Sequence, residues 1–124
     1  KTKMNIDVAG MQLKDGSGLS KFNAISSKQL VQVLIKMKNN QAFRKSIPIA
    51  GKSGTVRSFL KNSTLNSRVR CKSGSMTCVK SYAGYISNKS GKSFAFSIIV
   101  NNADASEKDV QVKIEELIDF IGSL

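Results

Sequence analysis

The spacing of apolar residues changes along the chain, and each spacing predicts a different kind of element. Between residues 27 and 39 apolar side chains recur every three or four positions, which predicts a helix with one face toward a core. Ser26 or Ser27 is the expected N-cap of this helix. The core-facing stripe comprises Leu30, Val31, Leu34, Ile35 and Met37.

A second helical spacing follows Ala105 and predicts a C-terminal helix. Asp104 or Ser106 is the expected cap, and acidic residues in the first turn, Glu107 and Asp109, suit the positive end of the helix dipole. Gly122 is the expected stop. The apolar stripe comprises Val110, Ile114, Leu117, Ile118 and Ile121.

Three runs between these helices predict β-strands at about residues 69–74, 79–87 and 92–100. The segment Asn88-Lys-Ser-Gly91 joins the last two as a hairpin turn. In the last run the alternation places four apolar residues on one face and Ile99 on the other. These four are Phe94, Phe96, Ile98 and Val100.

The remaining segments predict shorter elements. Residues 4–13 alternate loosely and predict one strand or two short ones, and residues 43–46 predict a helical turn that ends before Pro48. Asp15-Gly-Ser-Gly18 predicts a tight turn in which Asp15 accepts hydrogen bonds from backbone amides. Residues 55–61 predict a helix whose inward side chains are Val56, Phe59 and Leu60.

This order of elements predicts an α+β fold in which helices pack on an antiparallel sheet. The 124 residues contain no internal repeat and no long linker, so we expect residues 1–124 to form a single domain or part of a larger one. No run of about 18 apolar residues predicts a transmembrane helix. Because the chain starts at Lys1 and shows no signal peptide, we expect it to be a piece of a longer, processed or engineered protein.

The composition is strongly basic, with 20 Lys and Arg, 8 Asp and Glu, and a formal net charge of +12. Such a balance favours anionic partners such as nucleic acid, anionic lipid or an acidic cell-wall polymer. The basic residues are scattered, and no aromatic-basic motif accompanies them. We therefore expect no nucleic-acid partner, and a cell-wall setting accounts for the charge equally well.

Several kinds of chemistry are excluded by the residues present. The chain has no histidine, so Ser-His-Asp and Cys-His catalysis and histidine metal sites are absent. Gly51-Lys52-Ser53 lacks the preceding glycine and strand of a phosphate-binding loop. We expect no cofactor. Cys71 and Cys78 are either two small buried thiols, which we favour, or a disulfide formed in an oxidising compartment.

The most informative motif is Lys72-Ser73-Gly74, at the end of the first strand of the hairpin region. Lys-[Ser/Thr]-Gly is one of three motifs of penicillin-binding proteins and serine β-lactamases. The lysine supplies a cation for a substrate carboxylate, the hydroxyl donates to that carboxylate, and the glycine leaves room for a peptide against the strand. By itself the motif is short, and a polar turn after a strand is the alternative.

Other segments strengthen the motif by order and spacing. Asp15-Gly-Ser-Gly-Leu-Ser20 with Asn23 resembles D-G-S-G-L-S-x-x-N, and Pro48-Ile-Ala-Gly51 with Gly54-Thr55 resembles P-x-A-G-x-x-G-T. Arg70-Cys-Lys-Ser-Gly-Ser-Met76 resembles A-K-T-G-S-L, and the runs 82–86 and 94–101 resemble the hairpin that follows it. These patterns are those of the D-alanyl-D-alanine carboxypeptidase/endopeptidase family, the class C low-molecular-mass penicillin-binding proteins of peptidase family S13, which the chain therefore resembles.

The chain departs from the family pattern at three points. Ser73 stands where the family usually has threonine, and Cys71 replaces a small residue. The S-x-x-K and S-x-N motifs, which lie upstream in the family, are missing. Ser58-Phe-Leu-Lys61 matches S-x-x-K in letters only, because it lies 14 residues before Lys72 rather than far upstream, and we interpret it as coincidence.

The resemblance implies a C-terminal portion of a β-lactamase/transpeptidase-like domain, in a periplasmic or other extracytoplasmic cell-envelope enzyme. It implies a serine-type D-Ala-D-Ala carboxypeptidase/endopeptidase that acts on peptidoglycan stem peptides through an acyl-enzyme and is acylated by β-lactams. Lys72 would be catalytic, Ser73 and Gly74 would hold the substrate, and Ser75 would supply an oxyanion-hole N–H. The fragment alone is expected to be inactive.

Two other classes remain open at this point. A non-catalytic basic module that binds cell wall or another anionic polymer would bind such a polymer in a salt-dependent way. A nucleic-acid binder would show a steep salt dependence with nucleic acid. We also expect self-association through strands left unpaired at the edges of the sheet.

Overall fold

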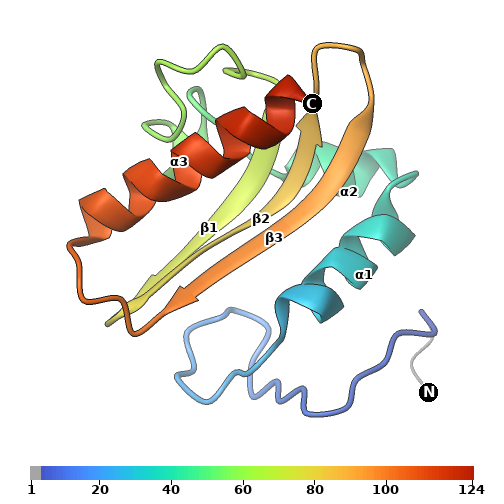
Figure 1. Cartoon of the computed structure of the whole chain (residues 1–124). Helices are drawn as coiled ribbons and strands as arrows, with labels where there is room; N and C mark the ends of the chain where they lie inside the picture. The colour runs from blue at the N-terminus through green and yellow to red at the C-terminus, as the bar shows by residue number, and fades with distance from the viewer. Residues whose placement is uncertain (1–3) are drawn as a thin grey trace.

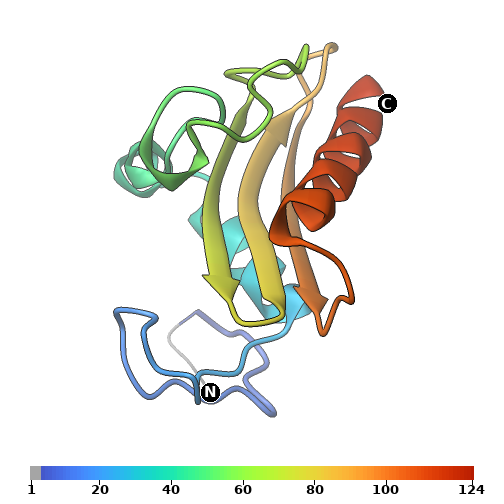
Figure 2. The same ribbon diagram turned by 90° about the vertical axis from the view of Figure 1, so that its left-hand side faces the viewer.

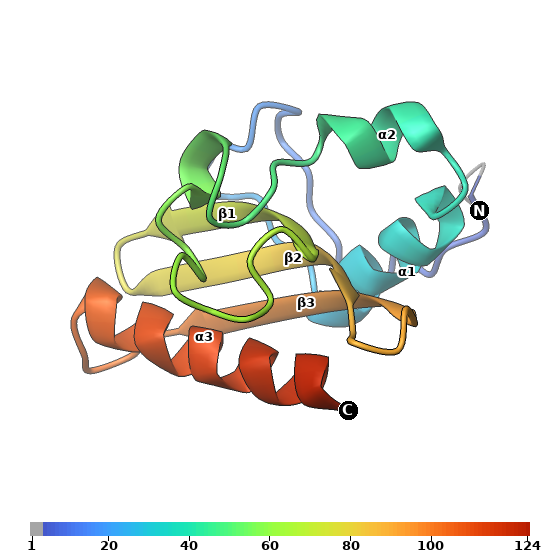
Figure 3. The same cartoon turned by 90° about the horizontal axis from the view of Figure 1, so that it is seen from above.

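The computed structural model describes residues 4–124 and has three layers. A three-stranded antiparallel sheet of order β1-β2-β3 forms the middle layer. Helix α3 covers one face of the sheet, and α1 and α2 lie on the other face (Figures 1 and 3). The expected α+β class is confirmed. The strands are β1 (Val69–Met76), β2 (Val79–Ser87) and β3 (Ser93–Asn101), and the helices are α1 (Ser27–Met37), α2 (Gln41–Ser46), the 3₁₀ turn η1 (Gly54–Val56) and α3 (Glu107–Ser123).

Both long helices begin at side-chain caps that the sequence predicts. At α1 the Ser26 hydroxyl accepts from the Gln29 N–H while the Gln29 side chain accepts from the Ser26 N–H, which is a reciprocal capping box. At α3 the Ser106 hydroxyl accepts from the Asp109 N–H. Of the two candidates for each cap, Ser26 and Ser106 are therefore the correct ones.

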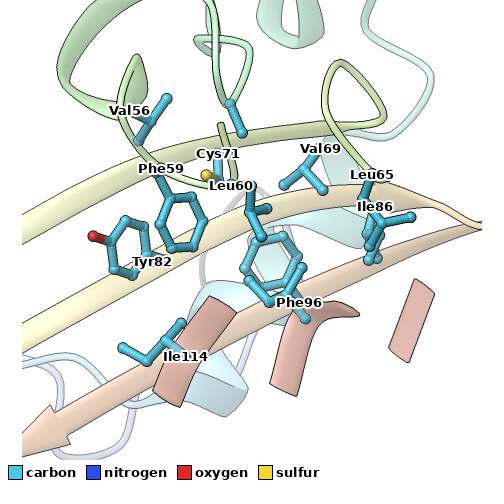
Figure 4. Close-up of a cluster of buried hydrophobic side chains, with 12 residues drawn as sticks. Val56, Phe59, Leu60, Leu65, Val69, Cys71, Tyr82, Ile86, Phe96 and Ile114 are labelled. Atoms are coloured by element: carbon cyan, nitrogen blue, oxygen red, sulfur yellow. The ribbon is translucent and has the colours of Figure 1, made fainter. Parts of the chain in front are cut away.

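The main core lies between the sheet and α3 (Figure 4). Strand register puts Val69, Cys71, Tyr82 and Ile86 on one face of the sheet, because residues two apart along a strand point the same way. The Tyr82 ring stacks on Phe59 at 4.0 Å between ring centroids. This cluster also includes Phe96 of β3 and two residues of α3, Ile114 and Ile118, so it joins α3 to all three strands.

A smaller cluster holds α1 against the opposite face. Leu34 and Tyr85 are buried there, and the Tyr85 hydroxyl donates to the Leu34 carbonyl at 2.6 Å. The Arg44 guanidinium of α2 lies 4.5 Å from the centre of the Tyr85 ring. Tyr85 thus connects β2 to both helices of this layer.

The strand expected within residues 4–13 is wrong. The described part of this segment is irregular, and its pairing is an isolated bridge between Gln12 and Ala24. Asn5 and Gly10 have positive φ values of 51° and 72°, which an extended strand does not allow. Of the apolar side chains that alternate here only Ile6 is buried, so the alternation does not mark a face against the core.

The helix expected at residues 55–61 is also wrong, although its buried side chains were predicted correctly. The backbone forms the three-residue turn η1 and then irregular turns. Ser53 makes no side-chain cap, and Leu60 has a φ of 56°, which ends any helical path. Val56, Phe59 and Leu60 are nevertheless at most 1% exposed, because this looped segment packs directly into the core.

The C-terminal helix differs from expectation at two residues. Leu117 is 46% exposed rather than part of the buried stripe. Gly122 lies inside α3 instead of ending it. A Cβ at Gly122 would overlap the Leu65 side chain, so the glycine serves close packing of the 62–67 loop on the helix.

The Asp15 turn forms as expected and lies at the end of the sheet where β1 finishes (Figures 1 and 2). Asp15 accepts from the backbone N–H groups of Leu19 and Ser20, from the Ser17 hydroxyl at 2.7 Å and from the Asn23 amide at 2.6 Å. The hydrogen bonds from Ser17 and Asn23 are the main reasons why the pKa of Asp15 falls from its usual value of 3.8 to about 2. The turn therefore depends on a charged carboxylate.

No helix within residues 4–124 combines the length with the apolar character that a membrane crossing requires.

Gly84 is expected to be the least replaceable glycine of the sheet. A Cβ there would overlap the Arg70 carbonyl and the Cys71 Cα on β1, which are backbone atoms that cannot rotate away. Gly84→Ala should lower the free energy of unfolding of the chain by about 2–3 kcal/mol in urea titrations. Gly16→Ala, where a Cβ meets no atom within 4 Å, is the matched control and should change it by less than about 0.5 kcal/mol. Equal effects of the two substitutions would contradict this account.

The Asp15 turn should be sensitive to acid in a defined window. Because the pKa of Asp15 is lower in the folded chain, the stability that the carboxylate contributes is present above pH 4 and is lost as the pH falls from about 4 to about 2. Protection of the Leu19 and Ser20 amides from hydrogen exchange should fall in this window, and Asp15→Asn should abolish the pH dependence. Asp104→Asn, which removes the same charge outside the turn, should preserve it. A pH profile that Asp15→Asn leaves unchanged would show that another group is responsible.

Candidate active site

The outer edge of β1 is closed along its first half. The Cys71 N–H donates to the Pro48 carbonyl at 3.0 Å, and the Ala50 N–H donates to the Val69 carbonyl at 2.9 Å. Residues 48–50 thus lie beside β1 as a short antiparallel partner, centred on the bridge between Ile49 and Arg70. The backbone groups of Val69 and Cys71 therefore face away from β2.

The second half of the same edge is open. Backbone groups of alternate residues point to the same side of a strand, so the N–H and C=O groups of Ser73 and Ser75 point outward like those of Cys71. Within residues 4–124 no backbone segment pairs with them. This edge of β1 can accept an extended peptide as an added strand.

Lys72 and Ser73 approach the open edge from opposite faces of the sheet. The exposed Lys72 side chain lies on the face of α1, and its Nζ donates to the Ser73 carbonyl at 2.6 Å. Since that carbonyl points to the open edge, the ammonium group is held beside it. Lys72 forms no ion pair with a carboxylate of the described residues, so its charge is available to an anionic ligand.

Packing against β2 favours glycine at position 74, in addition to the room that a glycine would leave for a ligand. It lies opposite Ser81 on β2, and a Cβ at Gly74 would come within 2.6 Å of the Ser81 hydroxyl oxygen. A side chain here would displace Ser81 or move β1 away from β2. The glycine thus leaves room for the Ser81 side chain between β1 and β2.

The Ser73 hydroxyl meets a partner that sequence reasoning did not identify. Thr55 Oγ1 of η1 lies 2.7 Å from Ser73 Oγ, and either oxygen can donate. The Gly54-Thr55 pair was recognised as part of a family segment, yet the sequence predicted only a helix there. The hydroxyl of Thr55, the last residue of this segment, was the only signal in the sequence for a contact with the site.

Ser75 is also held from a distant part of the chain. Its hydroxyl donates to Glu107 Oε2 at 2.9 Å, and Lys80 Nζ donates to the same oxygen at 3.1 Å. These two hydrogen bonds, that of Lys80 first, lower the pKa of Glu107. The first residue of α3 therefore fixes the end of β1, and the sequence, which showed Glu107 only as a favourable first-turn acid, gave no sign of it.

Cys71 lies inside the core and is not a reactive thiol. Burial raises its pKa to about 12, although the nearby Lys72 opposes the shift, so the thiol stays protonated at neutral pH. Cys78 is exposed, and both cysteines are free. The expectation of two buried thiols holds for Cys71 and is wrong for Cys78.

The segment Ser58-Phe-Leu-Lys61, which matches S-x-x-K by coincidence, does not place its serine and lysine one helical turn apart on a helix. These residues lie in irregular turns rather than on an α-helix, and both Ser58 and Lys61 are exposed. The described residues hold no cluster of three or more metal-binding side chains. What the site offers chemically is a cation, two hydroxyls and an open row of backbone donors and acceptors.

Comparison with known proteins identifies one family. The sequence profile of the D-Ala-D-Ala carboxypeptidase 3 (S13) family matches residues 2–121. Penicillin-sensitive carboxypeptidase A of Dictyostelium discoideum is 34% identical over 84% of this chain and 22% of its own length. The D-alanyl-D-alanine carboxypeptidase DacB of Haemophilus influenzae is 31% identical over 95% of this chain and 26% of its own length.

Solved structures give the same result at the level of the fold. Penicillin binding protein 4 (dacB) from Haemophilus influenzae matches 98% of this chain and 30% of its own chain, with a TM-score of 0.83 and 25% identity. The same protein complexed with a novel β-lactam matches 97% of this chain and 28% of its own, with a TM-score of 0.77 and 30% identity. This chain spans about a quarter of the length of these relatives. The chain belongs to the D-Ala-D-Ala carboxypeptidase 3 (S13) family.

Proposed function

We propose that this chain supplies the substrate-binding strand of a serine-type D-Ala-D-Ala carboxypeptidase/endopeptidase that acts on peptidoglycan stem peptides. The observation that carries the proposal is the open edge of β1 at Ser73 and Ser75, flanked by the unpaired cation of Lys72. A D-Ala-D-Ala terminus is an extended peptide that ends in a carboxylate, and this edge offers a partner for each of those features.

In this proposal the stem peptide lies antiparallel to β1 along the open edge. The backbone of Ser73 and Ser75 pairs with the peptide, and the Ser75 N–H donates to the oxygen of the scissile carbonyl as it becomes negative. The Ser73 hydroxyl and the Lys72 ammonium bind the terminal carboxylate from the two faces of the strand. Gly74 leaves the path of the peptide clear.

The reaction itself uses a serine from outside these residues. Its oxygen bonds to the carbonyl carbon of the penultimate D-Ala, the C–N bond to the last D-Ala breaks, and the leaving nitrogen takes a proton. Water then attacks the ester carbon, the acyl C–O bond breaks, and the serine oxygen regains a proton. Lys72 assists these proton transfers.

The proposal also covers inhibition by penicillins and the cell compartment in which the enzyme works. A penicillin carries an acyl group and a nearby carboxylate, as the stem peptide does, so it should occupy the same edge of β1. The names of the relatives, one penicillin-sensitive and one complexed with a β-lactam, support this. Because peptidoglycan lies outside the cytoplasmic membrane, the enzyme should work in the periplasm or another extracytoplasmic compartment.

Lys72 is the residue whose loss should damage the reaction most. Lys72→Ala in the full-length gene product should slow both D-Ala release and acylation by fluorescent penicillin roughly 10²- to 10⁴-fold, because the proton-transfer partner and the carboxylate cation disappear together. Lys89→Ala, on the exposed hairpin turn between β2 and β3, is the matched control and should leave both rates unchanged. Wild-type rates in Lys72→Ala would refute the role assigned to the strand.

The 124-residue chain alone should not react covalently with penicillin. Ser58, whose surroundings resemble a nucleophile motif in letters only, lies in an irregular turn. Intact-mass spectrometry after incubation with benzylpenicillin should show only the unmodified chain, and Ser58→Ala should give the same result. A stoichiometric adduct that disappears in Ser58→Ala would overturn this view.

A further inference from the structure

The contact between Thr55 and Ser73 joins two segments that lie 18 residues apart in the sequence. Thr55 Oγ1 and Ser73 Oγ are 2.7 Å apart, and Thr55 is otherwise exposed. Residues 48–50 close the edge of β1 only as far as Cys71. Thr55 therefore stands at the point where the closed part of the edge gives way to the open part.

The backbone around Thr55 is firmly held. The next residue, Val56, is fully buried, and its carbonyl accepts from the Gly51 N–H at 3.0 Å. The Ser53 hydroxyl accepts from the Ile49 N–H at 2.9 Å. Gly54 has a φ of 59°, and a Cβ there would come within 2.9 Å of the Pro48 ring. Thr55 is thus presented to Ser73 by a short loop that is anchored on both sides.

The direction of this hydrogen bond follows from the number of protons available. A hydroxyl has one proton to donate and two lone pairs that accept. If Ser73 donated to Thr55, it would have no proton left for a substrate carboxylate. If Thr55 donates to Ser73, the Ser73 proton is free and the lone pair that faces Thr55 is already occupied, so the proton is directed elsewhere.

We propose that Thr55 is a positioning residue: its hydroxyl donates to Ser73 Oγ and thereby directs the Ser73 proton to the terminal carboxylate of the substrate. The inference rests on the proposed function and adds to it a residue that acts only through Ser73. In such a chain each hydrogen bond polarises the next, so the Ser73 donor becomes stronger toward an anion.

Serine at position 73 makes this assistance necessary. A threonine side chain is branched at Cβ and keeps one or two rotamers, whereas serine can occupy all three staggered positions. The Thr55 contact selects one of them. A threonine introduced at position 73 should therefore depend less on Thr55 than the native serine does.

The experiment compares acylation by benzylpenicillin with acylation by its methyl ester in the full-length protein. The ester keeps the reactive lactam and lacks the anion that Ser73 binds. Thr55→Val should slow acylation by the acid roughly three- to tenfold, as expected for the loss of one hydrogen bond, and leave acylation by the ester within about twofold. Thr55→Ser should behave like the native protein, and Thr55→Val with Ser73→Thr should recover most of the rate with the acid.

Two further variants complete the design. Thr64→Val removes an exposed threonine hydroxyl that bonds to no described residue, and it should change neither rate. Thr55→Ala repeats the test if valine disturbs folding, which circular dichroism would show. If Thr55→Val and Thr55→Ala keep the native ratio of acid to ester rates, the inference is wrong.

The test separates this inference from the proposed function. If the unsubstituted protein is not acylated by benzylpenicillin, the proposed function fails, and the role of Thr55 fails with it. If the unsubstituted protein is acylated and the acid-to-ester ratio does not depend on Thr55, only the inference fails.

Discussion

The half-closed edge of β1 is the constraint on which the rest of the candidate site depends. Residues 48–50 bond to the Val69 carbonyl and the Cys71 N–H and pair with no later residue of β1. Unpaired backbone groups on an exposed strand attract other strands, so a fold normally covers or interrupts them. Here one half of the edge is covered and the adjacent half is left free, so the peptide of the proposed function can pair only with Ser73 and Ser75.

On the face toward α3, two segments distant in sequence hold this open stretch. Thr55 contacts the Ser73 hydroxyl and Glu107 contacts the Ser75 hydroxyl. Both contacts depend in turn on the core, because Val56 anchors the loop of Thr55 and because Ile114 and Ile118 anchor α3 under Glu107. The core between the sheet and α3 therefore sets the geometry of the edge. A change that loosens this core should therefore move the open edge, since Tyr82 of the core lies directly opposite Ser73 on β2.

The sequence predicts those parts of the fold whose signals are local. The cap at Ser26, the hairpin from β2 to β3 and the Asp15 turn were all recognisable, because each depends on neighbouring residues. The errors occurred where distant contacts decide the structure. Residues 55–61 carry a helical spacing of apolar residues, yet burial of Phe59 and Leu60 against the sheet is achieved by turns. Lys72 and Ser73 were predicted from their motif. The contacts of Thr55 with Ser73 and of Glu107 with Ser75 were not predicted, because these partners lie 18 and 32 residues apart and no local pattern indicates the pairing.

The distribution of charge completes the physical picture of the site. Six of the eight acidic residues lie within residues 104–119, whereas 18 of the 20 basic residues precede residue 104. Since α3 covers one face of the sheet and α1 and α2 lie on the other (Figure 3), the acidic residues of α3 are separated by the sheet from α1 and α2. Lys72 extends toward the face of α1, and no carboxylate among the described residues forms an ion pair with it. An anionic ligand that approaches the open edge therefore meets a positive potential on that side, which raises the rate of encounter at low ionic strength. Glu107, on the face of α3, bonds to Lys80 and Ser75, and the Lys80 cation offsets its charge. In the proposed function this difference between the two sides draws the terminal carboxylate of the stem peptide toward Lys72 rather than toward Glu107.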